Sequence, residues 1–293
     1  MNFQNLPEEA RKLFVPAPGY AFVFGDFSNL ELRVMAYEFD DEVLQDMFAR
    51  GLNIHDENTK VMFGITPSHK DWKHIRRAAK VAVFGRSYGG GIRGIYERVS
   101  SQVPELSFTM AQFRLADKRY FERHPKLAEG FKRASSEAKR TRKCTTETGR
   151  VRFFLGTPDE VEREGINTPI QGAAGDIENE SLIELYDMCE AHRWKLVATV
   201  HDSNGIECPI ADVHECAKVL KETMEKPRFL WGKTVVFPAD ISVSTTSWGE
   251  MKDYGEWCEE QKASRKASVK RSKPKRPRST TPSGSARNAA SLR

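Results

Sequence analysis

Two cations and two aromatic rings recur at every fourth position in one stretch of this 293-residue chain. They are Arg76, Lys80, Phe84 and Tyr88. At about 3.6 residues per turn, this spacing places them along one slowly drifting stripe of a helix. Cations bind a polyphosphate, and flat rings stack on a base and a sugar. The stripe therefore predicts a helix that holds a nucleotide lengthwise, although a solvated cationic face followed by two core aromatics would give the same pattern.

An aspartate lies on each side of this helix in the sequence. Asp26 ends residues 20–25, which read as a buried strand, and Asp202 follows residues 195–201, which read as another strand, at a predicted hairpin turn. Two carboxylates from separate segments can hold two Mg²⁺ ions about 3.5–4 Å apart, which activate an attacking hydroxyl and stabilise a leaving phosphate. In isolation, each acid is more simply a strand-end or turn residue. The order acid, cation–aromatic helix, acid indicates a nucleotidyl transferase.

These three segments resemble motifs A, B and C of the family A DNA polymerases, the group of bacterial DNA polymerase I and its phage relatives. Residues 25–33 resemble the family's Asp-Tyr-Ser-Gln-Ile-Glu-Leu-Arg, and residues 76–89 resemble Arg-x3-Lys-x3-Phe-Gly-x2-Tyr-Gly. Residues 200–202 match the first three positions of the family's Val-His-Asp-Glu. Linking segments at residues 2–7, 53–64 and 167–176 are similar to family segments too. The resemblance runs from about residue 2 to about residue 257 and favours a phage-like member.

The resemblance implies a DNA-directed DNA polymerase that extends a primer with deoxynucleoside triphosphates (dNTPs). Asp26 and Asp202 match the two residues that hold the Mg²⁺ ions and are catalytic. The cations of the motif B stripe would bind the triphosphate, and its two rings would face the sugar and the base. Phosphoryl transfer of this kind needs charge neutralisation and alignment more than a covalent side chain.

The resemblance also implies residues that recognise the sugar and the primer–template. Glu31 matches a glutamate that crowds the space of a ribose 2′-hydroxyl, and its simpler alternative is an exposed helix residue. His55 resembles a histidine that contacts the triphosphate. The residues matched to primer–template contacts are Arg163, Asn167, Gln171 and His201. Minor-groove acceptors common to all base pairs would let such contacts check pair geometry without reading sequence.

Three departures from the family pattern keep alternatives open. Phe27 replaces a tyrosine, and Ser203 replaces the glutamate after the motif C aspartate. His-Asp-Ser is what single-subunit phage RNA polymerases carry there, so an RNA polymerase-like enzyme is an alternative. Glu31 and the segment 167–171 weigh against it. The family's thumb and exonuclease cannot fit before residue 20, so we expect a split or truncated enzyme whose companion polypeptide supplies them. A catalytically silent nucleic-acid-binding subunit is the alternative from another class.

The elements expected around these motifs define an α+β fold. Helices are expected at 30–39, at 40–66 with a break near Gly51, up to Tyr88, at 109–143, at 172–192 and at 211–224. Strands are expected at 195–201, 205–208 and 235–243, with a hairpin at 148–154. In the family this is an antiparallel-sheet palm with a mostly helical fingers insertion. We therefore predict a palm at 1–55 and 166–258, fingers at 56–165 and a disordered basic tail at 259–293.

All of the excess positive charge of the chain lies in that tail. Residues 259–293 hold eleven basic and two acidic residues, which leaves 35 basic and 39 acidic residues in the rest. A segment this poor in apolar side chains cannot offset its ordering entropy, so disorder is expected. It would bind nucleic-acid phosphates without sequence preference, serve as a solubilising extension, or act as a nuclear signal.

The composition also bears on the compartment. The five cysteines form no Cys-x-x-Cys pair, which favours reduced thiols and argues against a structural zinc site. No run approaches the ~20 apolar residues of a membrane span, and the first residues do not form a secretory signal. We therefore predict a cytoplasmic protein without membrane association, with a nuclear location left open.

Overall fold

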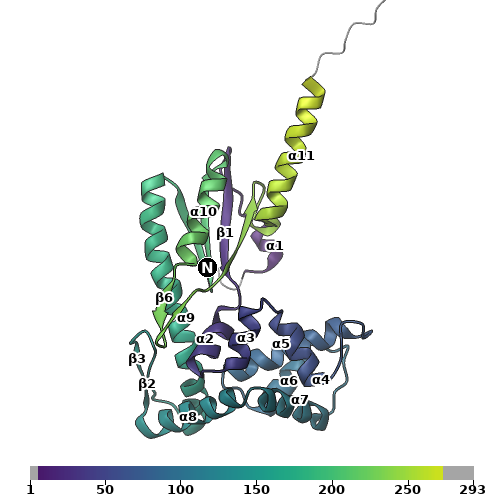
Figure 1. The fold of residues 1–293 in the computed structure, drawn as a ribbon, viewed down its shortest axis with the longest axis vertical. Coiled ribbons are helices and arrows are strands. Elements are labelled where there is room, and N and C mark those ends of the chain that lie inside the picture. Colours follow the sequence, from purple (N-terminus) through teal and green to yellow (C-terminus); the bar gives the residue numbers. More distant parts are fainter. Residues whose placement is uncertain (1–5, 273–293) are drawn as a thin grey trace, which may run out of the picture.

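The computed structural model describes residues 6–272, so residues 273–293 of the predicted tail lie outside the described residues. The chain forms a strand-bearing half and a helical half, joined by one long helix (Figure 1). The strand-bearing half contains one five-stranded antiparallel sheet in the order β4-β5-β1-β8-β9. Its strands are β4 Lys195–Val200, β5 Ser203–Pro209, β1 Tyr20–Phe27, β8 Ala239–Ser244 and β9 Lys252–Asp253. An antiparallel sheet with segregated helices confirms the predicted α+β class.

The central strand β1 is buried along almost its whole length, and Asp26 is its one exposed residue. In register, Asp26 lies opposite Ser203 of β5 and opposite Asp240 of β8. Residues directly opposite each other project from the same face of a sheet. The fold therefore gathers three polar side chains at the end of the sheet.

The two faces of the sheet are covered unequally. Ala21, Val23 and Phe27 belong to the main core with α10 (Val213–Met224). At Gly25 an added Cβ would lie 2.5 Å from Met224 Sδ, so α10 packs directly on β1. On the opposite face Phe22 and Phe24 form a smaller cluster with Trp248. That face is covered by α1 (Glu8–Arg11) and the 3₁₀ turn η3 (Trp248–Glu250), whose Trp248 stacks on Phe24 of β1.

The helical half follows β1 directly. Its helices are α2 Leu30–Glu38, α3 Glu42–Ala49, α4 Ile54–Phe63, α5 Trp72–Ser87, α6 Ile92–Gln102, α7 Met110–Arg123 and α8 Pro125–Thr141. Side chains of Asp41 and Asn53 cap α3 and α4, and Thr109 forms a capping box on α7, as the residue types favour. The helices predicted at 30–39, at 40–66 with a break and up to Tyr88 are confirmed. The 109–143 region divides at His124, just before Pro125.

A buried hydrogen bond that the sequence did not predict joins two of these helices. His124 Nδ1 lies 3.0 Å from Asp41 Oδ1, and the two residues are 0% and 1% exposed. The ring of Tyr120 lies 4.8 Å from that of His124, centroid to centroid. This pair fixes the start of α3 against the junction of α7 and α8.

The joining helix α9 spans Pro158–His192, so the prediction of a helix from residue 172 was wrong about its start. Pro169 lies inside it, and a proline usually ends a helix because it lacks an N–H donor. Here the buried side of α9 packs on α8 so closely that a Cβ at Gly165 would lie 2.4 Å from Ala138 Cβ. Tertiary packing therefore carries the helix through the proline.

Two other expectations about the strands need correction. The β4–β5 turn consists of His201 and Asp202 alone, since Val200 pairs with Ser203, whereas we placed the turn at residues 202–205. His201 has a φ of 57°, the left-handed conformation that such a two-residue turn requires. The strand expected at 235–243 divides, because Pro238 cannot donate to a ladder. Its first part is β7 (Lys233–Val235), which pairs with β6 (Arg228–Leu230), and its second part is β8.

The expected hairpin near 148–154 forms from β2 (Lys143–Thr145) and β3 (Val151–Phe153). The predicted disorder of the tail is wrong for residues 259–272, because α11 (Tyr254–Ser272) continues through them and projects from the body (Figure 1). Tyr254 and Trp257 stack on each other and anchor its first turn. Within residues 6–272, no helix is long and apolar enough to cross a membrane.

Candidate functional site

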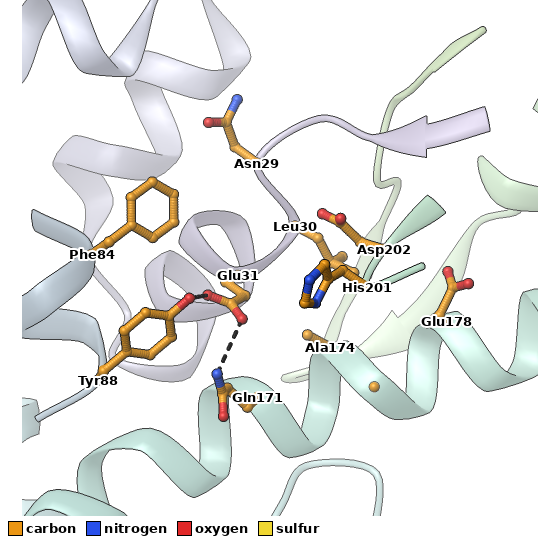
Figure 2. A pocket seen from close by; sticks show the side chains of 11 residues that line it. Asn29, Leu30, Glu31, Phe84, Tyr88, Gln171, Ala174, Glu178, His201 and Asp202 are labelled. Carbon is orange, nitrogen blue, oxygen red and sulfur yellow. Dashed lines mark hydrogen bonds between the residues drawn. The ribbon is translucent and has the colours of Figure 1, made fainter. Parts of the chain in front are cut away.

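A cavity of about 540 Å³ lies where α2, α5 and α9 meet the turn between β4 and β5 (Figure 2). Its lining brings together six of the twelve predicted site residues: Glu31, Phe84, Tyr88, Gln171, His201 and Asp202. They come from four segments that are far apart in the sequence. The cavity also includes Glu178, which the sequence did not single out.

The two predicted catalytic aspartates lie at the end of the sheet. The N–H of Phe27 donates to the carbonyl of Asp202 at 3.0 Å, which ties the end of β1 to the β4–β5 turn. Burial raises the pKa of Asp26 to about 7, and the negative charges of Asp202 and Asp240 add to the effect. Burial also raises the pKa of Asp202, while its own backbone and His201 oppose the shift. Ionisation of both aspartates is therefore unfavourable unless positive charge is bound.

The donor atoms here suit a hard cation. Carboxylate oxygens, with the hydroxyl of Ser203 opposite Asp26 and that of Ser28 just after β1, are the ligand type that Mg²⁺ prefers. Within the described residues no three His, Cys, Asp or Glu side chains come together to hold one ion. Two aspartates fit Mg²⁺ nonetheless, because this ion keeps several waters and is bound by one or two carboxylates plus phosphate oxygens.

Glu31 is held in place by two donors on the wall of the cavity. Tyr88 Oη donates to Glu31 Oε2 at 2.8 Å, and Gln171 Nε2 donates to Oε1 at 3.4 Å (Figure 2). Asn167 Nδ2 in turn donates to Gln171 Oε1 at 2.8 Å. Burial raises the pKa of Glu31, and the two hydrogen bonds partly offset this shift. Burial, with the charge of Glu31, also raises the pKa of Tyr88 above its ordinary value.

The cationic part of the predicted stripe lies outside the cavity lining. Lys80 Nζ lies 5.8 Å from the centroid of the Phe84 ring and leads away from the cavity along α5. Arg76, one turn further, donates to the carboxylate of Asp56, so part of its charge is already neutralised. The ring of His55 lies 5.9 Å from that of Phe84. Burial, followed by the charges of Lys80 and Arg76, lowers the pKa of His55 to about 4, so this histidine is neutral at pH 7.

Two of the predicted DNA contacts line a neighbouring cavity of about 440 Å³. Arg163 and Asn167 face it from α9, and Tyr88 belongs to both cavities. Gly89, with a φ of 70°, lies so near the backbone of Arg163 that an added Cβ would be 2.6 Å from its carbonyl oxygen. This close approach joins the end of α5 to α9 and sets where Tyr88 stands.

Asp26 opens toward a third cavity, of about 490 Å³, on the face of the sheet that carries Phe22 and Phe24. Arg11 and Trp248 also line this cavity, and the Arg11 guanidinium lies 4.8 Å from the Trp248 ring centroid. Arg11 Nε is buried and has no hydrogen-bond partner within residues 6–272. The sequence did not reveal this cation, because its place depends on a tryptophan more than 200 positions away.

Glu178 is the other residue that the sequence missed. It is 6% exposed, and Thr199 Oγ1 donates to its Oε1 at 3.4 Å. Burial raises its pKa to about 7. The Asn204 amide opposes this shift, and the charges of Asp202 and Asp26 add to it. No periodic or motif signal in the sequence marks this position.

Acids at two strand ends, next to a helix of aromatic rings and cations, define a site suited to a nucleotide and its phosphates. A family model described as DNA polymerase family A matches residues 1–250. The chain belongs to this family, which confirms the resemblance found in the sequence. Whether it is phage-like stays a prediction.

Relatives and a solved structure agree with this assignment. Thermostable DNA polymerase I of Thermus filiformis is 31% identical over 237 residues, covering 76% of this chain and 28% of the relative. DNA polymerase I of Chloroflexus aurantiacus is 29% identical over 265 residues, covering 85% of this chain and 27% of the relative. The chain thus spans less than a third of the length of these relatives. The fold resembles the POL domain of Pol1 from M. smegmatis, solved with DNA primer–template and dNTP (TM-score 0.73, 23% identity, covering 85% of this chain and 44% of that one).

Proposed function

We propose that this chain performs template-directed addition of deoxynucleotides to the 3′ end of a primer. The observation that carries the proposal is the shared cavity of Asp202, Glu31, Tyr88 and Phe84, which combines acidic, sugar-facing and aromatic groups. Membership of DNA polymerase family A supports it. The substrates would be primer–template DNA and dNTPs.

Asp26 and Asp202 would hold two Mg²⁺ ions. When bound, these ions supply charge neutralisation on the triphosphate and lower the pKa of the attacking hydroxyl. The aspartates keep this charge at the end of the sheet, on a β1–β5 frame fixed by the bond from Phe27 to the turn. His201, next to Asp202 in the turn, would face the primer end.

Lys80 and Arg76 would bind the triphosphate along α5. The structure describes no ion pair of Lys80 with an acidic residue, whereas Arg76 already pairs with Asp56. Lys80 is therefore the readier phosphate ligand, and Arg76 would exchange part of its contact with Asp56. His55, uncharged and next to Phe84, would donate or accept a hydrogen bond without adding charge.

Glu31 would select the sugar. Its two donors fix the carboxylate against the cavity, so a ribose 2′-hydroxyl would have to displace it from Tyr88 or Gln171. Loss of a hydrogen bond to a charged group costs about 1.5–3 kcal/mol. This arrangement would favour deoxynucleotides over ribonucleotides. It therefore supports a DNA polymerase over the RNA polymerase-like alternative that Ser203 suggests.

We also propose the division into palm (1–55 and 166–258) and fingers (56–165). The boundary at 165/166 falls inside α9, so this helix would be shared by both parts. Arg163, Asn167 and Gln171 follow one another at every fourth position along it. They would contact the minor groove of the primer–template as the duplex leaves the cavity.

Primer extension by the purified chain tests the proposal. A labelled primer on a longer template should be extended with dNTPs in Mg²⁺, and Asp202→Ala should abolish extension while primer–template binding persists. Extension with equal use of both sugars would favour the RNA polymerase-like alternative. No extension, even when a polypeptide carrying a thumb is added, would favour the catalytically silent subunit and contradict our proposal.

A further inference from the structure

Glu178 has no part in the chemistry proposed so far, although its carboxylate is buried at the same cavity as Asp202. It projects from α9 toward the strands that carry Asp202 (Figure 2). Its Oε2 is buried and has no hydrogen-bond partner among the described residues. A polar group buried in this way costs free energy that an apolar side chain would not. Packing alone therefore gives no reason for a glutamate here.

The groups around Glu178 come from the β4–β5 hairpin, directly below its turn. Thr199 and Asn204 lie opposite each other in register, and Asn204 is 0% exposed. The Asn204 amide lies near enough to Glu178 to affect its pKa, yet neither of its polar atoms meets hydrogen-bond geometry. A half-satisfied polar layer like this one is unfavourable by itself. Thr199 and Asn204 are the second pair of residues below the turn that carries Asp202, so this polar layer lies directly beneath that turn.

The negative charge of the carboxylates at this end of the cavity also favours a bound cation. The turn contributes one carboxylate only, because Asp202 is followed by Ser203. Both Asp202 and Asp26 act on Glu178 with like charge. Among the described residues, these acids do not converge closely enough to hold one ion together. Glu178 would therefore act on a bound cation from a greater distance, and Mg²⁺ keeps waters that can bridge such a distance.

We propose that Glu178 is a positioning residue of the metal site. Its carboxylate accepts hydrogen bonds from water bound to the cation at Asp202, which strengthens cation binding and holds the turn in place. The proposal rests on the two-metal function proposed above.

Titration of the full chain with Mn²⁺ by calorimetry tests this role. Glu178→Gln keeps the shape and removes the charge, and we expect Mn²⁺ affinity to fall about tenfold, as for a unit charge acting on a divalent ion through one layer of water. Asp187→Asn is the matched control, since it removes an exposed charge from the same helix and should leave the affinity unchanged. Urea unfolding should show no loss of stability in Glu178→Gln, because a buried charge is removed.

Primer extension gives a second readout. The Mg²⁺ concentration for half-maximal extension should rise about tenfold in Glu178→Gln, with the maximal rate recovered at saturating Mg²⁺. Unchanged Mn²⁺ affinity in Glu178→Gln, or an equal loss in Asp187→Asn, would overturn the role of Glu178. Asp202→Ala separates the two proposals: if it binds Mn²⁺ as the native chain does, the two-metal function itself fails. If Asp202→Ala loses binding and Glu178→Gln does not, only the inference on Glu178 fails.

Discussion

Removing the charge of Asp26 should stabilise the metal-free protein at alkaline pH, although the same change should abolish its activity. The pKa of Asp26 rises from its ordinary 3.8 to about 7 in the folded chain, because of burial first and then Asp202 and Asp240. In the unfolded chain the carboxyl ionises near its ordinary pKa. The favourable contribution to folding is therefore complete below pH 4 and is lost as the pH rises through 7.

The size of the effect follows from this pKa difference. A tenfold change in proton affinity is worth about 1.4 kcal/mol, so the ceiling is about 4 kcal/mol at pH 8. Asp26 is also more than a third exposed, and solvent screening reduces the figure to about 2 kcal/mol. At pH 5 the unfavourable contribution of Asp26 to folding is less than half of its value at pH 8, which is below about 1 kcal/mol.

Urea unfolding in EDTA, at pH 5 and pH 8, measures the difference. Asp26→Asn should raise the free energy of unfolding by about 2 kcal/mol at pH 8 and by less than half of that at pH 5. Asp187→Asn, an exposed acid on α9, is the control and should show no such pH dependence. If Asp26→Asn destabilises the chain equally at both pH values, Asp26 ionises normally and the argument about like charges at the sheet end is wrong.

Three further predictions concern other parts of the chain. Glu31→Ala should raise the kcat/KM for ribonucleotides relative to deoxynucleotides by about 10- to 100-fold, the worth of one hydrogen bond to a charged group; an unchanged ratio would contradict sugar selection by Glu31. His124→Ala should lower the free energy of unfolding by about 3–5 kcal/mol, because it leaves a cavity in place of a fully buried ring and removes a hydrogen-bond partner of the buried Asp41 carboxylate; urea melts measure this, with His69→Ala as the exposed control. Deleting residues 259–293 should weaken duplex binding. The slope of log affinity against log salt concentration should become shallower by about 0.9 for each phosphate that the shortened chain no longer neutralises. Fluorescence anisotropy across a salt series measures this slope, which would be unchanged if these residues only aid solubility.

Nine of the twelve residues predicted from the sequence line one of the three cavities, and the signals that marked them are local. Asp26 and Asp202 each follow a recognisable strand, and the four-residue spacing placed Phe84 and Tyr88 on one side of a helix. The structure brings Asp202, Phe84 and Tyr88 to one cavity, whereas Asp26 lines a separate cavity at the end of β1. The spacing could not show that Arg76 is already paired, because Asp56 lies on a different helix, 20 residues earlier.

What the sequence missed depends on contacts between distant segments. The start of α9 was misplaced because Pro169 signals an end that the packing of α8 on Gly165 overrides. The turn was misplaced because Asn204-Gly205 is a strong turn signal, yet both residues lie in β5, paired with Gly25 and Phe24 of β1. Arg11 and Glu178 carry no local signal at all.

The polar groups that break the rules of burial are themselves informative about the site. Natural chains depart from locally favourable choices mainly at functional positions. Several buried polar atoms have no hydrogen-bond partner among residues 6–272, and three of them, Arg11 Nε, Asn167 Oδ1 and Glu178 Oε2, belong to residues that line the three cavities described above. Cationic, amide and anionic groups left unpaired on different sides of one site suit a ligand with phosphates, base edges and metal ions. A fold stabilised for its own sake would have replaced them with apolar residues, so the same groups that weaken the folded chain are the ones we expect a bound substrate to satisfy.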